Sequence, residues 1–279
     1  MQDLGERASE ASKVLATAST DDKNETLRSA ADCLLAATQE VLDANLRDVR
    51  RAEASQTSET VIDRLRLDAG RVEAMAEGLR KLIHLPDPAG KIVESWTRPN
   101  GLQIQKVQVP LGVVAIIYEN RPNVTSDAFG LCLKSGNVAF LRGSSAAIDS
   151  NIAIARALRE GIAKAGLPED CLVLVTDTSH RTAIEFMQLR DHIDCLIPRG
   201  GPSLINSILE NATVPYVIDG DGNCHVYVDI DADLALAESV VVNAKMQRPS
   251  VCNAAESLVV HADIAAEFLP RIAGALEGV

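Results

Sequence analysis

The sequence of 279 residues lacks the features of membrane-spanning and exported proteins. It has no run near the roughly 18 consecutive apolar residues that a membrane-spanning helix needs. The stretch from Met1 to Glu10 is polar and of mixed charge, without the apolar core of a signal peptide. No Cys-x-x-Cys pair occurs, so we expect reduced thiols and a cytoplasmic protein. The cysteines are scattered along the chain, at Cys33, Cys132, Cys171, Cys195, Cys224 and Cys252.

Basic residues are also scarce. The chain has 27 Lys and Arg against 39 Asp and Glu, which gives a formal net charge of −12. A diffuse negative field repels phosphodiester backbones and argues against a nucleic-acid partner, although a local basic pocket for a small anion remains compatible with it. The 5 histidines show no metal-ligand spacing, so no metal site is predicted. The Walker A and Gly-x-Gly-x-x-Gly motifs of nucleotide-binding loops are absent too.

What is present is the composition of a globular protein, with 47% apolar and 24% charged residues. The length fits one large or two ordinary domains. Apolar spacing predicts a helix face over 27–42, with Ser19 or Thr20 as its cap, and a second helix over 59–82. Alternation around an Asn-Gly turn predicts a hairpin over 96–109.

From residue 110 onward, short apolar runs alternate with helical stretches. Strands are predicted at 113–118, 137–141, 171–175 and 193–197, each followed by a helix. This order indicates an α/β fold with a parallel sheet, and the continuous apolar runs fit strands buried on both faces. After Asp229 the pattern changes to a helix, a strand over 257–261 and a final helix, which predicts a domain boundary near Asp231.

Ligands of open parallel sheets bind at the carboxyl ends of the strands. Two predicted strands end in similar loops, Arg142-Gly143-Ser144-Ser145 and Arg199-Gly200-Gly201, each followed by a helix. Free N–H groups at such helix starts face a phosphate favourably, and an arginine pairs with one. Taken alone, such a loop is more typical of an ordinary capped turn with a surface arginine.

Two further segments remain open between a structural and a chemical role. The run Tyr118-Glu119-Asn120-Arg121-Pro122-Asn123 follows the first strand of the series and also suits a helix entry. Cys252 lies in a loop beside Arg248 and polar residues, a setting typical of reactive thiols, whereas a free cysteine more often packs as a small apolar residue.

Taken together, several runs resemble one known family. They are Val109-Pro-Leu-Gly-Val113, Tyr118-Glu-Asn-Arg-Pro-Asn-Val-Thr125, Leu133-Lys-Ser-Gly-Asn137, Leu141-Arg-Gly143, Gly222-Asn-Cys-His225 and Asn243-Ala-Lys-Met-Gln-Arg-Pro-Ser-Val-Cys-Asn253. The chain is similar over its whole length to the γ-glutamyl phosphate reductase branch of the aldehyde dehydrogenase superfamily. The resemblance implies a Rossmann-type cofactor domain and an α/β catalytic domain.

The resemblance also implies a chemistry and its residues. Cys252 would attack γ-glutamyl phosphate, expel phosphate and form a thioester, which hydride from NADPH reduces to glutamate 5-semialdehyde in proline biosynthesis. The backbone N–H of Cys252 and an Asn side chain would stabilise the oxyanion. Asn120 takes the position of the superfamily's oxyanion Asn, with Asn123 and Asn253 as alternatives. The superfamily's general base Glu corresponds to Asp219.

For the cofactor, the resemblance points to the two loops at the strand ends. Arg142, Gly143, Ser144, Ser145, Gly200 and Gly201 are the expected cofactor-binding residues. Ser145 stands where the superfamily often has a Glu that binds a ribose hydroxyl, and with Arg142 it favours NADP over NAD. Arg121, Arg199, Arg248 and Asn253 are the expected substrate-binding residues.

The expected organisation is an NADP-binding domain over 1–231 and the start of a catalytic domain over 232–279, whose C-terminal remainder is missing. The hairpin over 96–109 resembles the family's oligomerisation flap, so a homodimer or homotetramer is expected. The alternatives are a general aldehyde dehydrogenase and an inactive nucleotide-binding fragment.

Overall fold

The computed structural model describes residues 1–218, 222–249 and 251–277. It divides the chain into two compact units, Met1–Ile218 and Asp219–Val279. The predicted boundary near Asp231 lies inside the second unit. The reason is that β7 (His225–Val228) pairs with β8 (Ser257–Val260), so a strand assigned to the first domain belongs to the second.

A four-stranded parallel sheet forms the centre of the first unit, in the order β5-β4-β3-β6. Its strands are β3 (Val113–Tyr118), β4 (Val138–Arg142), β5 (Leu172–Leu174) and β6 (Cys195–Arg199). All six residues of β3, a central strand, are buried. A strand covered on both faces requires apolar side chains at consecutive positions, as the sequence predicted. This sheet confirms the α/β fold.

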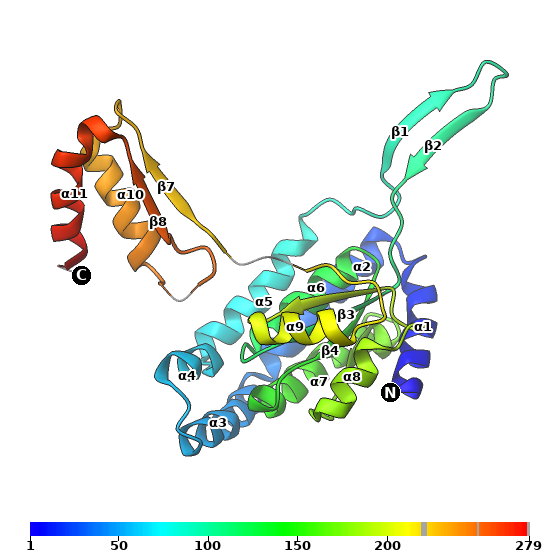
Figure 1. The fold of residues 1–279 in the computed structure, drawn as a ribbon. Helices are drawn as coiled ribbons and strands as arrows, with labels where there is room; N and C mark the ends of the chain where they lie inside the picture. The colour runs from blue at the N-terminus through cyan, green and yellow to red at the C-terminus, as the bar shows by residue number, and fades with distance from the viewer. Residues whose placement is uncertain (219–221, 250, 278–279) are drawn as a thin grey trace. The chain divides into compact units, whose positions relative to one another are not determined.

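Helices cover both faces of the sheet (Figure 1). Connections between parallel strands are right-handed, so the connecting helix lies on one face while the chain moves from β3 to β5, and on the other face when it returns to β6. α6 (Asn123–Lys134) and α7 (Ile148–Lys164) lie on one face, and α8 (His180–Met187) and α9 (Pro202–Asn211) on the other. The rings of Phe140 and Phe186 meet edge to face, with their centroids 4.9 Å apart. Burying one such ring stabilises the fold by about 1.5–3 kcal/mol.

Four N-terminal helices form an outer layer on the side of α6 and α7: α2 (Thr20–Ala36), α3 (Thr38–Ala54), α4 (Glu59–Leu65) and α5 (Ala69–Ile83). The first helix, α1 (Gln2–Leu15), packs instead against the strands β3, β4 and β5. α2 contacts α5, α6 and α7, and α3 contacts α7. Ser19 caps α2, as predicted, in a capping box with Asp22.

Two helix predictions in this region are wrong about continuity. The helix predicted over 27–42 breaks at Ala37, although neither Gly nor Pro occurs there. The helices before and after the break, α2 and α3, both pack on α7, and this packing determines where the chain turns. The helix predicted over 59–82 breaks between α4 and α5. Asp68 starts α5 by accepting a hydrogen bond from the Arg71 N–H at 2.7 Å. Asp is a preferred N-cap residue, so the sequence did carry this signal.

The hairpin is present, and it begins earlier than predicted. β1 (Ile92–Thr97) pairs antiparallel with β2 (Gln103–Val107), so that Trp96 stands opposite Ile104. The turn closes at Gly101, whose φ of +85° is a conformation that glycine adopts without strain. Figure 1 shows the hairpin projecting from the body of the first unit.

The second unit has its own small core. β7 and β8 form a parallel pair, and α10 (Leu234–Met246) and α11 (Ala262–Glu277) pack with them. Buried Val228, Val241, Phe268 and Ile272 form the core cluster. Within the described residues, no helix is long and apolar enough to cross a membrane.

Candidate active site

The carboxyl ends of three neighbouring strands meet at one edge of the sheet. Ile117 of β3 pairs with Arg142 of β4, and Tyr118 of β3 pairs with Arg199 of β6. The loops that follow these strands therefore start side by side, as expected for parallel strands. They carry most of the site residues proposed from the sequence.

The loop after β3 bridges to the two others through consecutive side chains. The Asn120 Oδ1 accepts a hydrogen bond from the Ser144 hydroxyl at 3.0 Å, which joins it to the loop after β4. The Glu119 Oε2 accepts one from the Gly201 N–H at 3.1 Å, which joins it to the start of α9. Because Asn120 binds Ser144 through its oxygen, its amide donors face away from that contact.

Asn123, the alternative oxyanion donor, is engaged elsewhere. Its Nδ2 donates to the Asp127 carboxylate at 2.9 Å, one turn later on α6. An amide held by a carboxylate must give up a charge-assisted hydrogen bond before it serves a substrate oxygen. Of these two residues of the first unit, Asn120 is therefore the better candidate for the oxyanion donor.

The start of α9 has the features of a phosphate-binding position. Gly201 is the N-cap of α9, Pro202 follows at the first helical position, and no side chain from its own loop caps the helix. A Cβ added to Gly201 would meet nothing within 4 Å, so the backbone there is open. At Gly200 a Cβ would lie 2.7 Å from both Glu119 Cδ and Leu204 Cδ2. Glycine thus lets the chain pass close to Glu119 and still expose helix N–H groups to an anion.

The start of α7 differs, because a carboxylate from the N-terminal layer already occupies it. Asp48 on α3 accepts hydrogen bonds from the Ser150 N–H at 2.8 Å, the Ser150 hydroxyl at 2.6 Å and the Asp149 N–H at 3.3 Å. Arg51 is also paired with this carboxylate, and Asp48 is 0% exposed. Burial raises the pKa of Asp48, against the lowering effect of these hydrogen bonds and of Arg51.

At the start of α7 the Asp149 and Ser150 N–H groups are therefore not free, whereas the 3-10 turn Ser145–Ala147 that precedes them has no side-chain cap. The sequence-based reasoning missed Asp48, since it lies about a hundred residues from its partners and resembles any other acidic residue of an exposed helix. Gly143 is likewise explained by packing: a Cβ there would lie 2.1 Å from the buried Asn151 Nδ2. Ser144 is half-buried in its contact with Asn120, and Ser145 is exposed.

Arg142 reaches across to the next loop. Its Nη2 donates to the carbonyl oxygens of Thr178 and Ser179 at 2.9 and 3.0 Å. Burial lowers the pKa of Arg142, and nearby Asp177 opposes that effect. The guanidinium thus ties the loop after β4 to the start of α8, and its role toward a cofactor phosphate stays a prediction. Arg199, at the end of β6, is exposed.

In the second unit, Cys252 lies in a turn between α10 and β8 and is exposed, like its neighbours Arg248 and Asn253. The turn is held by the Ala254 N–H, which donates to the Val251 carbonyl at 3.2 Å. Lys245 at the end of α10 donates to the Ala255 carbonyl at 3.0 Å, which fixes the far side of the turn.

The four cysteines of the first unit contrast with Cys252 because all are buried. Burial raises the pKa of the Cys132 and Cys171 thiols to about 12 and also raises that of Cys195. Asp219, expected at the general-base position, lies outside the described residues.

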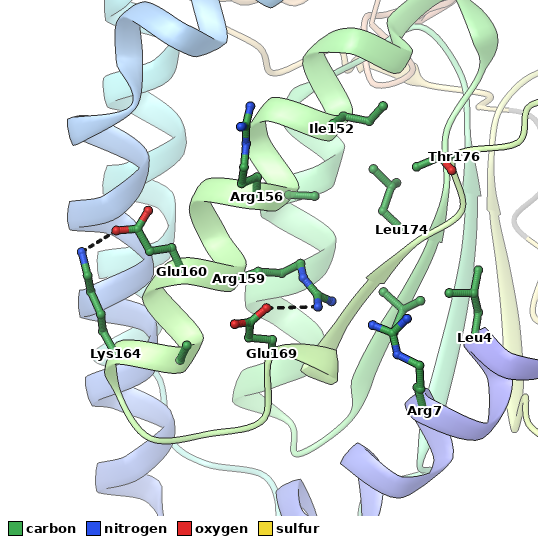
Figure 2. Close-up of a pocket in the computed structure, with 13 residues that line it drawn as sticks. Leu4, Arg7, Ile152, Arg156, Arg159, Glu160, Lys164, Glu169, Leu174 and Thr176 are labelled. Carbon is green, nitrogen blue, oxygen red and sulfur yellow. Dashed lines mark hydrogen bonds and ion pairs between the residues drawn. The ribbon is translucent and has the colours of Figure 1, made fainter.

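A cavity of about 800 Å³ lies elsewhere, between α1, α7 and β5 (Figure 2). Its lining includes Arg7, Arg159 and Lys164, and each of these cations is paired with a carboxylate of the protein. None of the site residues predicted from the sequence lines it. Because its charges are already matched internally, we assign this cavity no part of the candidate site.

A sequence model of the aldehyde dehydrogenase family matches residues 2–279. The chain belongs to the aldehyde dehydrogenase family. Among curated members, it is 53% identical over 272 residues to γ-glutamyl phosphate reductase of Clostridium botulinum and 51% identical over 268 residues to that of Heliobacterium modesticaldum. These matches cover 98% and 96% of this chain, and 66% and 64% of the relatives. The chain thus spans somewhat less than two thirds of their length.

Solved structures of this aldehyde dehydrogenase family agree with the fold. The crystal structure of γ-glutamyl phosphate reductase from Thermotoga maritima matches with a TM-score of 0.92 and 42% identity, covering 99% of this chain and 67% of that one. A propionaldehyde dehydrogenase from Rhodopseudomonas palustris matches with a TM-score of 0.71 and 18% identity, over 98% of this chain and 57% of that one. The second match supports the fold alone.

Proposed function

We propose that this chain is the NADPH-dependent γ-glutamyl phosphate reductase of proline biosynthesis, or the greater part of one. The observation that carries the proposal is the exposed Cys252, in a turn fixed from both sides, in a chain about half identical to relatives of that name. The reaction releases phosphate and yields glutamate 5-semialdehyde.

In the proposed mechanism, the Cys252 thiolate attacks the acyl carbon, and the carbon–oxygen bond to phosphate breaks. Splitting the reduction into acyl transfer and thioester reduction replaces one difficult step with two easier ones. The nicotinamide cofactor supplies the hydride for the second step. The oxyanion is stabilised by the Cys252 N–H and by an Asn amide, with Asn120 and Asn253 as the candidates.

The chain's own residues fit a dinucleotide at the start of α9. The open backbone at Gly201 and the helix N-terminus that no residue of its own loop caps are suited to a pyrophosphate. We propose NADP rather than NAD, because Ser145 is exposed and uncharged at the position where a carboxylate would repel a 2′-phosphate. Arg142 is the proposed source of attraction. A Ser145→Glu variant should lose affinity for NADPH while binding NADH at least as well, measured by fluorescence titration.

The anionic substrate requires cations, in opposition to the net charge of −12. We propose Arg121, Arg199 and Arg248, with Asn253, for the acyl phosphate and the glutamyl carboxylate. An Arg→Gln change at a residue that binds substrate should raise KM, whereas loss of an oxyanion donor should lower kcat.

We also propose that the chain forms a homodimer or homotetramer through the hairpin. Ile92, Val93, Trp96 and Val107 on β1 and β2 are each more than 40% exposed. An isolated two-stranded hairpin is marginally stable in water, so these side chains need a partner surface. Trp96→Ser with Val93→Ser should shift the sedimentation coefficient toward the monomer.

The decisive assay mixes the protein with glutamate 5-semialdehyde, phosphate and NADP, and follows NADPH formation. We expect phosphate-dependent turnover that Cys252→Ser abolishes, with Cys33→Ser as the matched control. Oxidation independent of phosphate would identify a general aldehyde dehydrogenase instead. NADPH binding without turnover would show a nucleotide-binding fragment, and an unchanged rate in Cys252→Ser would overturn the catalytic assignment.

A further inference from the structure

A second thiol lies beside the peptide of Cys252. Cys224 stands directly before β7, and its Sγ donates to the carbonyl oxygen of Cys252 at 3.5 Å. The backbone supports this contact, since the Cys224 carbonyl accepts from the Glu256 and Ser257 N–H groups at 2.9 and 3.1 Å. Residues far apart in the sequence thus share one corner of the second unit.

Gly222 gives independent evidence of this proximity. A Cβ added to Gly222 would lie 2.4 Å from the Cys252 carbonyl oxygen and 3.9 Å from its Cα. The strand entry at Gly222 and Cys224 therefore runs along the turn that carries the nucleophile. Only a glycine lets it pass that closely.

The position of the Cys224 sulfur limits its distance from the Cys252 sulfur. Standard bond lengths place a cysteine sulfur no more than about 5 Å from its own carbonyl oxygen. The Cys224 sulfur lies 3.5 Å from that oxygen, so the two sulfur atoms are at most about 8.5 Å apart, and rotation of both side chains changes this distance. Cys252 is exposed and Cys224 is half-buried, whereas Cys33, Cys132, Cys171 and Cys195 are buried.

We propose that Cys224 is a resolving cysteine, which forms a reversible disulfide with Cys252 after oxidation by a peroxide. The Cys252 thiolate attacks one peroxide oxygen, the O–O bond breaks, and a sulfenic acid forms with release of hydroxide. The Cys224 thiol loses its proton to solvent, and its sulfur attacks the Cys252 sulfur. The S–O bond breaks and water leaves, so two thiols have been oxidised and one peroxide reduced.

The disulfide has two consequences for a nucleophilic cysteine. It removes the thiolate while it lasts, so the reaction proposed above stops. It also protects Cys252 from further oxidation to sulfinic acid, which ordinary thiols do not reverse. A dithiol reductant restores both cysteines. The inhibition rests on the proposed function, whereas the formation of the disulfide does not.

Peptide mapping by mass spectrometry tests the proposal on the whole chain. After exposure to hydrogen peroxide, wild-type protein should lose two hydrogen atoms and yield a cross-linked peptide joining Cys224 to Cys252, which dithiothreitol splits. In Cys224→Ser, the same exposure should instead add two or three oxygen atoms to Cys252. Cys224→Ala should give the same result as Cys224→Ser. Because serine can still donate a hydrogen bond and alanine cannot, equal results would show that the thiol itself is required.

Cys171→Ser is the control, since it removes a buried thiol of the first unit and should leave the cross-link unchanged. Sulfinic acid forming at Cys252 equally fast in wild type and in Cys224→Ser would overturn the proposal. So would a disulfide that joins other cysteines. If the cross-link forms but the reductase assay shows no activity even in reduced protein, the proposed function fails and this inference stands.

Discussion

Two helices of the first unit begin beside a carboxylate that comes from another element, and the two carboxylates differ in almost every other respect. Asp48 at the start of α7 is fully buried and accepts hydrogen bonds from Ser150 and Asp149. Glu119 at the start of α9 is exposed and contacts the Gly201 N–H through one carboxylate oxygen. A buried, fully bonded carboxylate is a structural element, whereas an exposed one can be exchanged for another anion.

This difference assigns distinct roles to two loops that look alike in sequence. Arg142-Gly143-Ser144-Ser145 and Arg199-Gly200-Gly201 both join a strand to a helix at the same edge of the sheet. The first leads through a 3-10 turn, Ser145–Ala147, into α7, whose start Asp48 occupies. The second leads into α9, where Glu119 accepts from the Gly201 N–H, and we propose that a cofactor phosphate displaces Glu119 there.

The largest effect should come from Asp48→Ala. It leaves the Ser150 hydroxyl and two helix N–H groups without their acceptor in a buried place, and each such group costs about 1–3 kcal/mol. We expect the free energy of unfolding to fall by about 3 kcal/mol in urea titrations. Asp149→Ala, which removes a partly exposed carboxylate that pairs with Arg51, should cost well under half as much. Equal losses would contradict the distinction between buried and exposed partners.

A double-mutant cycle on Asp48 and Ser150 should give the next largest effect. Because the two side chains are bonded at 2.6 Å in a buried site, the cost of Asp48→Ala should be smaller in a Ser150→Ala background. We expect a coupling energy of about 1–2 kcal/mol, obtained from the four unfolding curves. Additive losses would show that the two residues act independently.

Glu119→Gln should affect binding more than stability. The amide oxygen can still accept from Gly201, but the charge that competes with a phosphate is gone. We expect NADPH to bind about three- to tenfold more tightly, a gain of about 1 kcal/mol, and the gain to shrink at high salt. Unfolding should change by less than about 0.5 kcal/mol. Weaker binding of NADPH would instead show that Glu119 holds the loop in place for the cofactor.

The smallest effect concerns Asp177, an exposed carboxylate before α8. Hydrogen bonds from Thr182 and Ser179 lower its pKa to about 2, from a usual value near 4. A lowered pKa in the folded state stabilises the protein above the usual pKa, and this contribution is lost as the pH falls from about 4 to about 2. Asp177→Asn should therefore unfold at a lower urea concentration than wild type at pH 7, with the two curves converging near pH 2. A gap that persists at all pH values would exclude this cause.

Residues near one another in the sequence allowed most of the fold to be predicted. The apolar run Val113–Tyr118 indicated a strand buried on both faces, and Arg98 to Gly101 indicated the turn of the hairpin. Local signals also have limits. The break at Ala37 carries no Gly or Pro, and the helical apolar spacing continues through it, because the packing of α2 and α3 on α7 creates that turn.

The candidate site could be proposed from the sequence where a single run of residues carries it. The segment from Asn243 to Asn253 pointed to Cys252 as the nucleophile, and the run after β3 contained both Asn120 and Glu119. Glu119 was overlooked because its partner, the Gly201 N–H, is a backbone group about 80 residues away. A side chain that binds distant backbone leaves no pattern in the sequence around it.

By itself, the sequence determined the family and the order along the chain of the strands of the parallel sheet, and it singled out Cys252 among the thiols, because all of these depend on local periodicity and contiguous motifs. Only the tertiary structure decided which helix start is open, through Asp48 and Glu119, and which cysteine accompanies Cys252. Both depend on contacts between segments that the chain brings together only on folding. Burial then decides whether such a contact is permanent, as at Asp48, or exchangeable, as at Glu119.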